Sequence, residues 1–249
     1  MREILLYFAL KYEGDFTGIY NALHKKEKVD MNGLQELTAK VNSHYVTIID
    51  DNYPEALKHI SSPPFVLFYH GDLTLLDNDL IAVIGMRKAS EYGKKAADFF
   101  TRQLVESGYV IISGMALGID YYAHQEALSS SGNTVAVLGS GINNCYPKRH
   151  QELYEDLKSS QLIISEYPDT TKAAPGNFPS RNRIIAGLAS KILVVEARER
   201  SGTMITVGFG LEAGKDIYCV PGRFDENRGC NMLIQQGAKL VLGVGDILD

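Results

Sequence analysis

The sequence predicts an α/β fold: a doubly wound, mostly parallel sheet preceded by a small helical lobe. Short apolar runs recur along most of the chain, and helical stretches separate them. The runs lie at 80–84, 109–112, 134–138, 161–164, 191–195 and 216–220, with a weaker one at 238–242. Strands that are apolar on both faces and alternate with helices are typical of a parallel sheet covered on both sides. Right-handed crossovers make such a sheet doubly wound.

The first 42 residues differ from the rest because their apolar residues follow a helical period. Three groups carry that period: Leu5, Phe8 and Ala9; Ile19 and Leu23; and Leu34, Leu37 and Val41. The segment is too short to hold a large core alone. We therefore expect a helical lobe over residues 1–42 and the sheet domain over 43–249.

Between the lobe and the first run of the sheet, Pro54, Pro63 and Pro64 exclude a continuous helix. The stretch 65–69 is apolar and aromatic, which is typical of a strand. Farther along, a helix is predicted over 91–107. Ser90 precedes it and Gly108 follows it, and these residue types favour helix starts and helix ends respectively.

The composition is that of a globular protein, with 45% hydrophobic residues, 22% charged residues and a net charge of -5. Proteins that coat nucleic acid over their whole surface are usually basic, so any such contact must use a local positive pocket. Cys145, Cys219 and Cys230 form no CxxC pair and no signal sequence precedes them, which favours buried thiols in a reducing compartment. The apolar run at 4–10 is too short to cross a bilayer. We expect a cytoplasmic protein without membrane contact.

Basic residues follow three different runs of the predicted sheet. Arg87 follows the first run and Lys148 the third, and FPSRNRII at 178–185 places Arg181 and Arg183 at a helix start after the fourth. Ligands bind at the carboxyl ends of strands in such sheets, and helix N-termini favour anions. We therefore expect these four side chains to face one crevice that binds phosphate. Glycines after the strands would let backbone N–H groups approach the anion, and they are Gly85, Gly114, Gly139 and Gly202.

Other kinds of site find less support. No G-x-G-x-x-G follows the first run, no acidic residue ends the second, and neither a Walker-type lysine loop nor a G-x-S-x-G elbow occurs. Asp120 and His124 lie one helical turn apart without a third metal ligand nearby, so packing or capping explains His124 better. Glu166 and Glu196 fit two interpretations, acid/base groups or partners that hold the arginines. We expect no metal, no cofactor and no catalytic residue.

Taken in order, these motifs closely resemble those of the DprA/Smf family of DNA-processing proteins. They read IAVIGMRKAS-YG, SGMALGID--AH, VAVLGSGIN--YP, SEYP, FPSRNRIIAGLA, VVEA---SGTMIT and VPG------GCN-LI--GA, from about Tyr53 to Gly243. The resemblance implies an extended Rossmann-like domain that binds single-stranded DNA, protects incoming DNA and loads the recombinase RecA onto it during natural transformation. The family usually has Gly-Ser-Arg or Gly-Thr-Arg at the first loop, where this chain has Met86 before its arginine. Family members often end in a winged helix, and this sequence stops at Asp249 without one.

The residues and the resemblance together predict a DNA-binding site in which Arg87 and Lys148 make the main phosphate contacts. The full predicted set is Gly85, Arg87, Ser90, Gly114, Gly139, Lys148, Arg181, Asn182, Arg183, Gly202 and Thr203. Phe178 fits two roles, stacking on a base or packing in the core. Contacts of this type read the backbone of the strand, so binding should be largely independent of base sequence.

Two other functions stay open, and one assembly is expected. A hydrolase resembling the LOG phosphoribohydrolases would need a glutamate where the loop at 201–206 has Thr206. A regulatory module could instead hold a free nucleotide in the same crevice. The family also implies a homodimer, and the apolar residues within 231–249 predict where it forms. A dimer with one groove per subunit could bridge two DNA segments.

Overall fold

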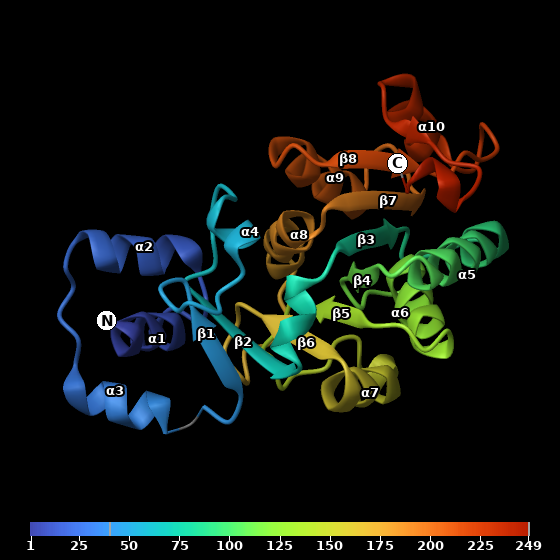
Figure 1. Ribbon diagram of the computed structural model, residues 1–249. Coiled ribbons are helices and arrows are strands. Elements are labelled where there is room, and N and C mark those ends of the chain that lie inside the picture. The colour runs from blue at the N-terminus through green and yellow to red at the C-terminus, as the bar shows by residue number, and fades with distance from the viewer. Residues whose placement is uncertain (40, 249) are drawn as a thin grey trace.

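A computed structural model describes residues 1–39 and 41–248. Within them lies a nine-stranded sheet with helices on both faces and a helical lobe at one end (Figure 1). The strands are β1 (His44–Thr47), β2 (Val66–Gly71), β3 (Leu80–Gly85), β4 (Val110–Ser113), β5 (Thr134–Val137), β6 (Leu162–Ser165), β7 (Lys191–Glu196), β8 (Asp216–Cys219) and β9 (Lys239–Leu240). The α-helices are α1 (Arg2–Lys11), α2 (Phe16–His24), α3 (Met31–Thr38), α4 (Glu55–Lys58), α5 (Glu91–Glu106), α6 (Ile119–Ser129), α7 (Gln151–Ser160), α8 (Asn177–Leu188), α9 (Gly202–Glu212) and α10 (Arg228–Gln235). Short 3-10 helices are η1 (Leu73–Asp77), η2 (Lys148–His150) and η3 (Val244–Asp246).

The strands lie in the order β1-β2-β6-β5-β4-β3-β7-β8-β9. From β6 to β9 neighbouring strands run parallel, whereas β2 is antiparallel to both β1 and β6. The parallel part begins at β3 in the middle, proceeds through β4 and β5 to β6 on one side, and then crosses to β7, β8 and β9. The predicted doubly wound, mostly parallel sheet is therefore confirmed. Successive strands are added on one side of β3 as far as β6 and on its other side from β7 onward, so the direction of winding reverses between β3 and β7.

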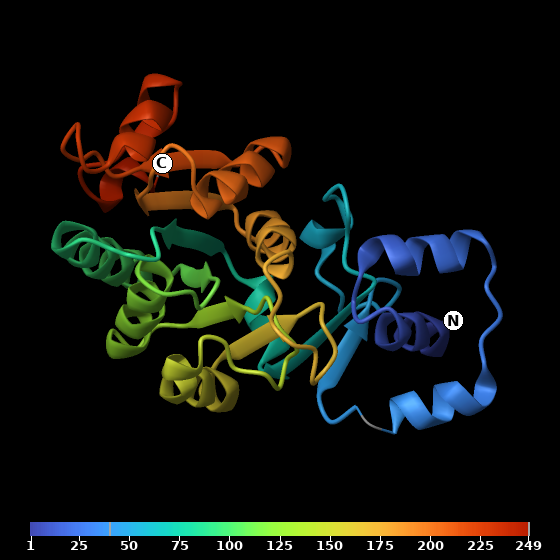
Figure 2. The ribbon, with the colours of Figure 1, turned by 180° about the vertical axis from the view of Figure 1, so that it is seen from behind.

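The core follows from the alternation of side chains along buried strands. In β3, Ala82 and Ile84 lie in an apolar cluster with residues of α4, α8, α9 and α10. Ile81 and Val83 lie in a second cluster with residues of α5 and α6, on the opposite face. Figure 2 shows the same layers from behind. Because β3 is covered on both faces, its carboxyl end is held in place from both sides.

Several local predictions are confirmed. The helix predicted over 91–107 is α5, and Ser90 caps it, because Ser90 Oγ accepts from the Gly93 N–H at 3.0 Å. Gly108 follows the helix with φ 90°, a conformation that favours glycine. Residues 66–69 of the run predicted at 65–69 lie in β2, which begins at Val66. The edge strand β1 was not predicted, since HYVT is short and its last two residues alone are buried.

The helical lobe packs against the end of the sheet that β1 and β2 form. Leu6 and Phe8 of α1 share an apolar cluster with Phe68 of β2 and Leu153 of α7. Figures 1 and 2 both show α1, α2 and α3 at the end of the molecule opposite α10. The division of the chain into units 1–42 and 43–249 stays a prediction, because the lobe and the sheet share this cluster.

The three cysteines are free and buried, as the sequence predicted. Among the described residues, no helix combines the length and the apolar character that a bilayer crossing requires.

Candidate functional site

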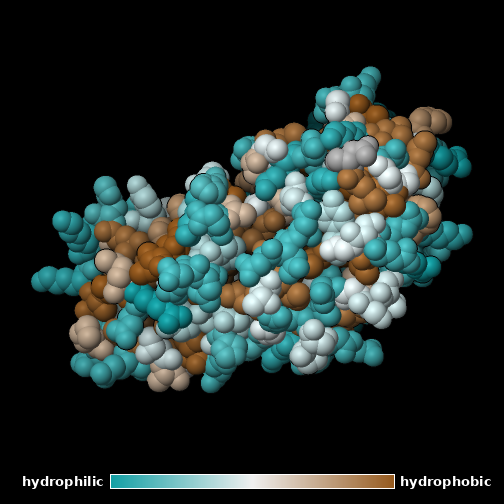
Figure 3. Space-filling view, viewed as in Figure 1, coloured by the Kyte–Doolittle hydropathy of each residue, from teal (hydrophilic) through white to brown (hydrophobic). Residues whose placement is uncertain are grey.

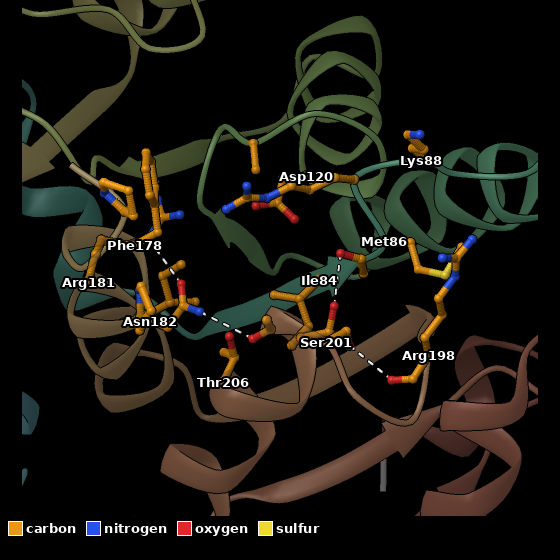
Figure 4. A pocket seen from close by; sticks show the side chains of 18 of the residues that line it. Ile84, Met86, Lys88, Asp120, Phe178, Arg181, Asn182, Arg198, Ser201 and Thr206 are labelled. Carbon is orange, nitrogen blue, oxygen red and sulfur yellow. Dashed lines mark hydrogen bonds between the residues drawn. The ribbon is translucent and has the colours of Figure 1, made fainter. Parts of the chain in front are cut away.

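A cavity of about 590 Å³ opens at the carboxyl ends of β3 and β7, where the strand order reverses. Its walls come from the loop after β3, the loop after β7 and the first turns of α8 and α9. Figure 4 shows Phe178, Arg181 and Asn182 of α8 on one side of this switch-point pocket, with Lys88 and Arg198 on the other. Reversal points of this kind are the usual ligand sites of doubly wound sheets.

Cations outnumber carboxylates in the lining of the switch-point pocket. Arg87 and Lys88 follow β3, and Arg198 and Arg200 follow β7; all four side chains belong to exposed residues. Arg181 contributes a fifth cation, whereas Asp120 is the one carboxylate among the described lining residues. Since the whole chain carries a net charge of -5, this positive charge is local. The pocket therefore suits an anion.

Arg181 lies at the bottom of the pocket and is only 3% exposed. Its Nη1 donates to Gly114 O at 2.7 Å and also to Val137 O. Burial, with Arg87 nearby, lowers the pKa of Arg181 to about 10, although Asp120 acts in the opposite direction. The guanidinium therefore stays charged at neutral pH. It joins the ends of β4 and β5 to α8 and adds positive potential to the pocket from below.

Asp120 balances part of this charge. It is buried, and its Oδ2 accepts from the Gly114 N–H at 3.2 Å. Burial raises the pKa of Asp120, and the charge of Arg181 opposes that shift. The Gly114 amide that was predicted to bind an anion is therefore already bonded to Asp120. A Cβ at Gly114 would lie 2.5 Å from the Arg181 guanidinium, so this glycine makes room for the buried arginine.

Polar side chains hold the walls of the pocket together. Thr203 Oγ1 donates to Gly85 O at 3.0 Å, and Asn182 Nδ2 donates to Gly202 O at 3.4 Å. Asn182 Oδ1 in turn accepts from Arg181 Nε at 3.1 Å (Figure 4). The pocket lining thus includes the predicted residues Gly85, Asn182, Gly202 and Thr203. However, the Asn182 and Thr203 side chains use hydrogen bonds to link β3, α8 and α9 to one another.

Aromatic rings form one rim of the pocket. Phe178 is half-buried, the Arg87 guanidinium lies over its ring at 5.3 Å, and the Tyr146 ring lies 5.3 Å away on a tilted plane. A Cβ at Gly139 would approach the Phe178 ring to 2.7 Å, so Gly139 allows this packing, and it is not among the described residues that line the pocket. Tyr146 is 49% exposed and extends the aromatic rim outward.

Arg183 does not join the other cations, which differs from the prediction of one shared crevice. It lines a second cavity of about 610 Å³ between the lobe and α8. Its guanidinium pairs with Glu166 through contacts of 2.6 and 2.7 Å and donates to Ser62 O and Ser180 O. Burial acts to lower the pKa of Arg183, but the pairing with Glu166 outweighs it and the pKa is raised. Of the two interpretations of Glu166, the structure supports pairing with an arginine.

Two further predicted residues lie outside the switch-point pocket. Ser90 caps α5, and its N–H donates to Glu196 Oε2 at 2.9 Å. Glu196 therefore places its own carboxylate at the start of α5 and does not pair with an arginine. Lys148 is exposed in η2, two residues after Tyr146, and is not among the residues that line the pocket. Of the four predicted cations, Arg87 and Arg181 share the pocket.

The residues that sequence reasoning missed are Lys88, Tyr146, Arg198 and Arg200. Arg198 and Arg200 follow the 191–195 run directly, which is the signal that selected Arg87 after the 80–84 run. His124, by contrast, is explained by packing, because it is fully buried and its Nδ1 lies 2.7 Å from Thr134 Oγ1. No group of three metal-binding side chains forms among the described residues.

Comparisons with known proteins show which family this chain resembles. A family model described as DNA recombination-mediator protein A matches residues 44–249. DNA processing protein DprA of Streptococcus pneumoniae is 42% identical over 204 residues, which are 81% of this chain and 72% of that protein. Protein Smf of Synechocystis is 39% identical over 213 residues, 83% of this chain. This chain spans only 54% of the length of that Smf protein.

Two solved structures extend the comparison to the fold. The X-ray structure of S. pneumoniae DprA superposes with a TM-score of 0.84 at 34% identity, over 99% of this chain and 92% of that one. The structure of DNA processing protein A from Helicobacter pylori superposes with a TM-score of 0.76 at 28% identity, over 83% of this chain and 94% of that one. The latter structure concerns the single-stranded DNA binding mode of the H. pylori protein.

Proposed function

Since the chain belongs to the DNA recombination-mediator protein A family, we propose that it binds and protects single-stranded DNA and loads RecA onto it in the cytoplasm. The observation that carries this proposal is the switch-point pocket, where five cations face one carboxylate in a chain of net charge -5. Single strands are held by positive grooves that follow the backbone, with aromatic surfaces for the bases. The pocket and its Tyr146–Phe178 rim supply both parts.

The phosphate contacts are assigned to two loops of the pocket wall. Arg87 and Lys88 lie in the loop after β3, and Arg198 and Arg200 lie in the loop after β7. The exposed Gly202 also lines the pocket and begins α9, which has no side-chain cap, so the first N–H groups of α9 also favour an anion. Arg181 contributes long-range attraction from below. Exposed Lys148 meets the strand where it leaves the pocket past Tyr146.

Tyr146 is the better candidate for base stacking. The Phe178 ring already contacts the Arg87 guanidinium and the Tyr146 ring and is only half-exposed, so less of it is available to a base. Tyr146 is 49% exposed and has room for a base. Stacking on a ring is tolerant of sequence because every base has a π-face. Binding is therefore largely independent of base sequence.

Hydrolysis of nucleotides has less support. Such a reaction needs a positioned acid or base. Thr206 lines the pocket where a LOG-type enzyme would carry its glutamate, and Asp120 is 8% exposed and bonded to the Gly114 amide. We propose a binding protein without catalysis and without a cofactor. Incubation with nucleoside monophosphates should release no free base.

The C-terminal end of the sheet supports the proposed homodimer. Leu240, Leu242 and Leu248 are 44%, 76% and 45% exposed, and Phe224 is 85% exposed. Figure 3 shows apolar side chains gathered over this end of the molecule, near α10. Beside them, β9 is the last strand of the sheet. A second copy that covers this surface would place two pockets in one particle and raise avidity for long strands.

The direct test is a fluorescence-anisotropy titration of the chain against single- and double-stranded oligonucleotides over a range of salt concentrations. We expect a clear preference for single strands and a log–log salt slope of about 0.7 per phosphate contact. In a second assay, the chain should speed assembly of RecA on a strand that is already coated by a single-strand-binding protein. Equal affinity for both forms of DNA, or binding without salt dependence, would contradict the proposal.

A further inference from the structure

The N-terminal lobe carries a ladder of stacked aromatic rings on its surface. Phe16 of α2 stacks on Phe65 at 5.2 Å with an interplanar angle of 13°. Tyr20 follows at 6.0 Å and 19°, and His24 follows Tyr20 at 6.0 Å and 6°. The three α2 rings are four residues apart, so they lie along one face of the helix.

The inner and outer parts of this ladder differ in their surroundings. Phe16 is half-buried against Phe65, so it anchors α2 to the sheet domain. Tyr20 is 52% exposed and His24 is exposed as well. The ladder ends at His24, beyond which no further ring is stacked among the described residues.

Three lysines follow this open end in the sequence. Lys25, Lys26 and Lys28 come within four residues of His24 and are all exposed. Glu27 stands among them; Lys11 Nζ and Tyr12 Oη each donate to one of its oxygens at 2.6 Å, and Lys25 is near enough to act on its charge. Over the described residues, no salt bridge holds any of the three lysines. An aromatic end face beside exposed cations that form no salt bridge among the described residues matches the chemistry of a base with its phosphates.

The second cavity lies between this ladder and the switch-point pocket. Phe16 and Thr17 line it from the lobe, and Asn177 and Ser180 line it from α8. Those two α8 residues share the first turns of the helix with Phe178 and Asn182, which line the switch-point pocket. Figure 1 shows α2 running from the side of α4 and α8 to the outer end of the lobe. Glu13 and Asp15 also line the second cavity, so a strand would cross it with few phosphate contacts.

We propose that the outer end of α2, formed by Tyr20, His24, Lys25, Lys26 and Lys28, is a second contact site for the same single strand. A strand that leaves the switch-point pocket past the start of α8 reaches this site, where a base stacks on His24 and phosphates meet the lysines. The inference rests on the proposed function, because it extends the path of that strand. It assigns the lobe a role in DNA binding.

The test compares the binding of two oligonucleotides, about 6 and about 20 nucleotides long, which bracket the site sizes usual for a single binding fold. The variants are His24→Ala and the double variant Lys25→Ala/Lys26→Ala. His24→Tyr keeps a ring at the ladder end, and Lys95→Ala removes an exposed lysine from α5. Far-UV circular dichroism and a thermal melt verify that each variant is folded.

We expect His24→Ala and the lysine double variant each to weaken binding of the long oligonucleotide by about fivefold or more. Binding of the short one should stay unchanged, and His24→Tyr and Lys95→Ala should bind both like the wild type. Unchanged affinity for the long oligonucleotide in both variants overturns the inference. If RecA loading is lost at the same time, the surface serves a protein partner and the inference fails as well. If the wild type binds neither oligonucleotide, the proposed function itself fails.

Discussion

Arg181 and Arg183 are two residues apart on α8, yet their guanidiniums serve different cavities. A step of two residues turns an α-helix by about 200°, so the two side chains leave the helix on nearly opposite sides. Arg181 donates to Gly114 O beneath the switch-point pocket, whereas Arg183 pairs with Glu166 in the second cavity. One motif thus supplies a cation to the proposed DNA site and an ion pair to the core.

The first prediction concerns this ion pair. Arg183→Met should lower the free energy of unfolding by about 3–5 kcal/mol, because it leaves Glu166 buried and without its partner. At temperatures where the variant is folded, affinity for short single strands should stay near that of the wild type. Urea denaturation measures the first effect and anisotropy the second. The double variant Arg183→Met/Glu166→Met should recover most of the lost stability, and a loss of affinity in the folded variant would place Arg183 in the DNA site instead.

The second prediction concerns the two walls of the pocket. Arg87→Ala and Arg198→Ala should each weaken single-strand binding, and each lost phosphate contact should reduce the log–log salt slope by about 0.7. Arg102→Ala serves as a control, because Arg102 lies on α5 and pairs with Glu126. Anisotropy titrations at several salt concentrations give both quantities. Wild-type slopes in both pocket variants would remove these residues from the proposed site.

The third prediction concerns Gly114. A Cβ there would lie 2.5–2.6 Å from three atoms of the Arg181 guanidinium, which two carbonyl oxygens hold in place. Gly114→Ala should therefore destabilise the fold by about 1–3 kcal/mol, as overpacking in a core does. Gly208→Ala is the matched control, since a Cβ there meets nothing within 4 Å and lies in helix α9. Thermal melts should show a lower midpoint for Gly114→Ala and an equal or higher one for Gly208→Ala.

The fourth prediction concerns pH. Burial lowers the pKa of His124 from 6.5 to about 3, with Arg181 and His150 acting in the same direction. The unfolded chain takes up a proton on this histidine below about pH 6.5 and the folded chain does not, so stability falls as the pH falls through that range. At pH 5 the loss due to His124 is about 2 kcal/mol. The fall in unfolding free energy between pH 7 and pH 5 should be smaller in His124→Gln by about that amount. Parallel curves for the two proteins would show that another group is responsible.

The fifth prediction concerns assembly. Leu242→Asp should shift the proposed dimer toward monomer, because it places a charge in the apolar surface at the C-terminal end of the sheet. Ile49→Asp is the control, since Ile49 is 53% exposed and follows β1 at the opposite edge of the sheet. Light scattering over a range of concentrations measures the mass. A wild-type monomer at micromolar concentration would contradict the proposal.

Much of the fold could be predicted from the sequence because buried parallel strands leave a direct signal. LIAVI and KILVV became the adjacent strands β3 and β7, since strands covered on both faces must be apolar throughout. The cap at Ser90 was predictable for a similar reason, as its signal lies within a few residues. β1 gave no such signal, because HYVT at the edge of the sheet is apolar on only part of its length.

The site was harder to predict because sequence position does not fix the direction of a side chain. The sequence placed both Arg87 and Arg183 near the same edge of the sheet, and their spacing from the strands gave no reason to expect one of them outside the crevice. Only the helix phase of α8 and the buried carboxylate of Glu166 separate Arg183 from the pocket. Gly114 and Gly139 show the same limit, since their missing side chains make room for Arg181 and Phe178.

The carboxylate of Glu196 has a consequence for selectivity inside a cell. It occupies the start of α5, where it accepts from the Ser90 N–H, and a Cβ at Gly93 would come within 2.3 Å of it. Related folds use that helix start to hold the pyrophosphate of a dinucleotide. In this protein a coenzyme would have to displace the Glu196 carboxylate before its pyrophosphate could bind at that helix start. We therefore expect the start of α5 to disfavour dinucleotide coenzymes, which leaves the neighbouring switch-point pocket to other anions.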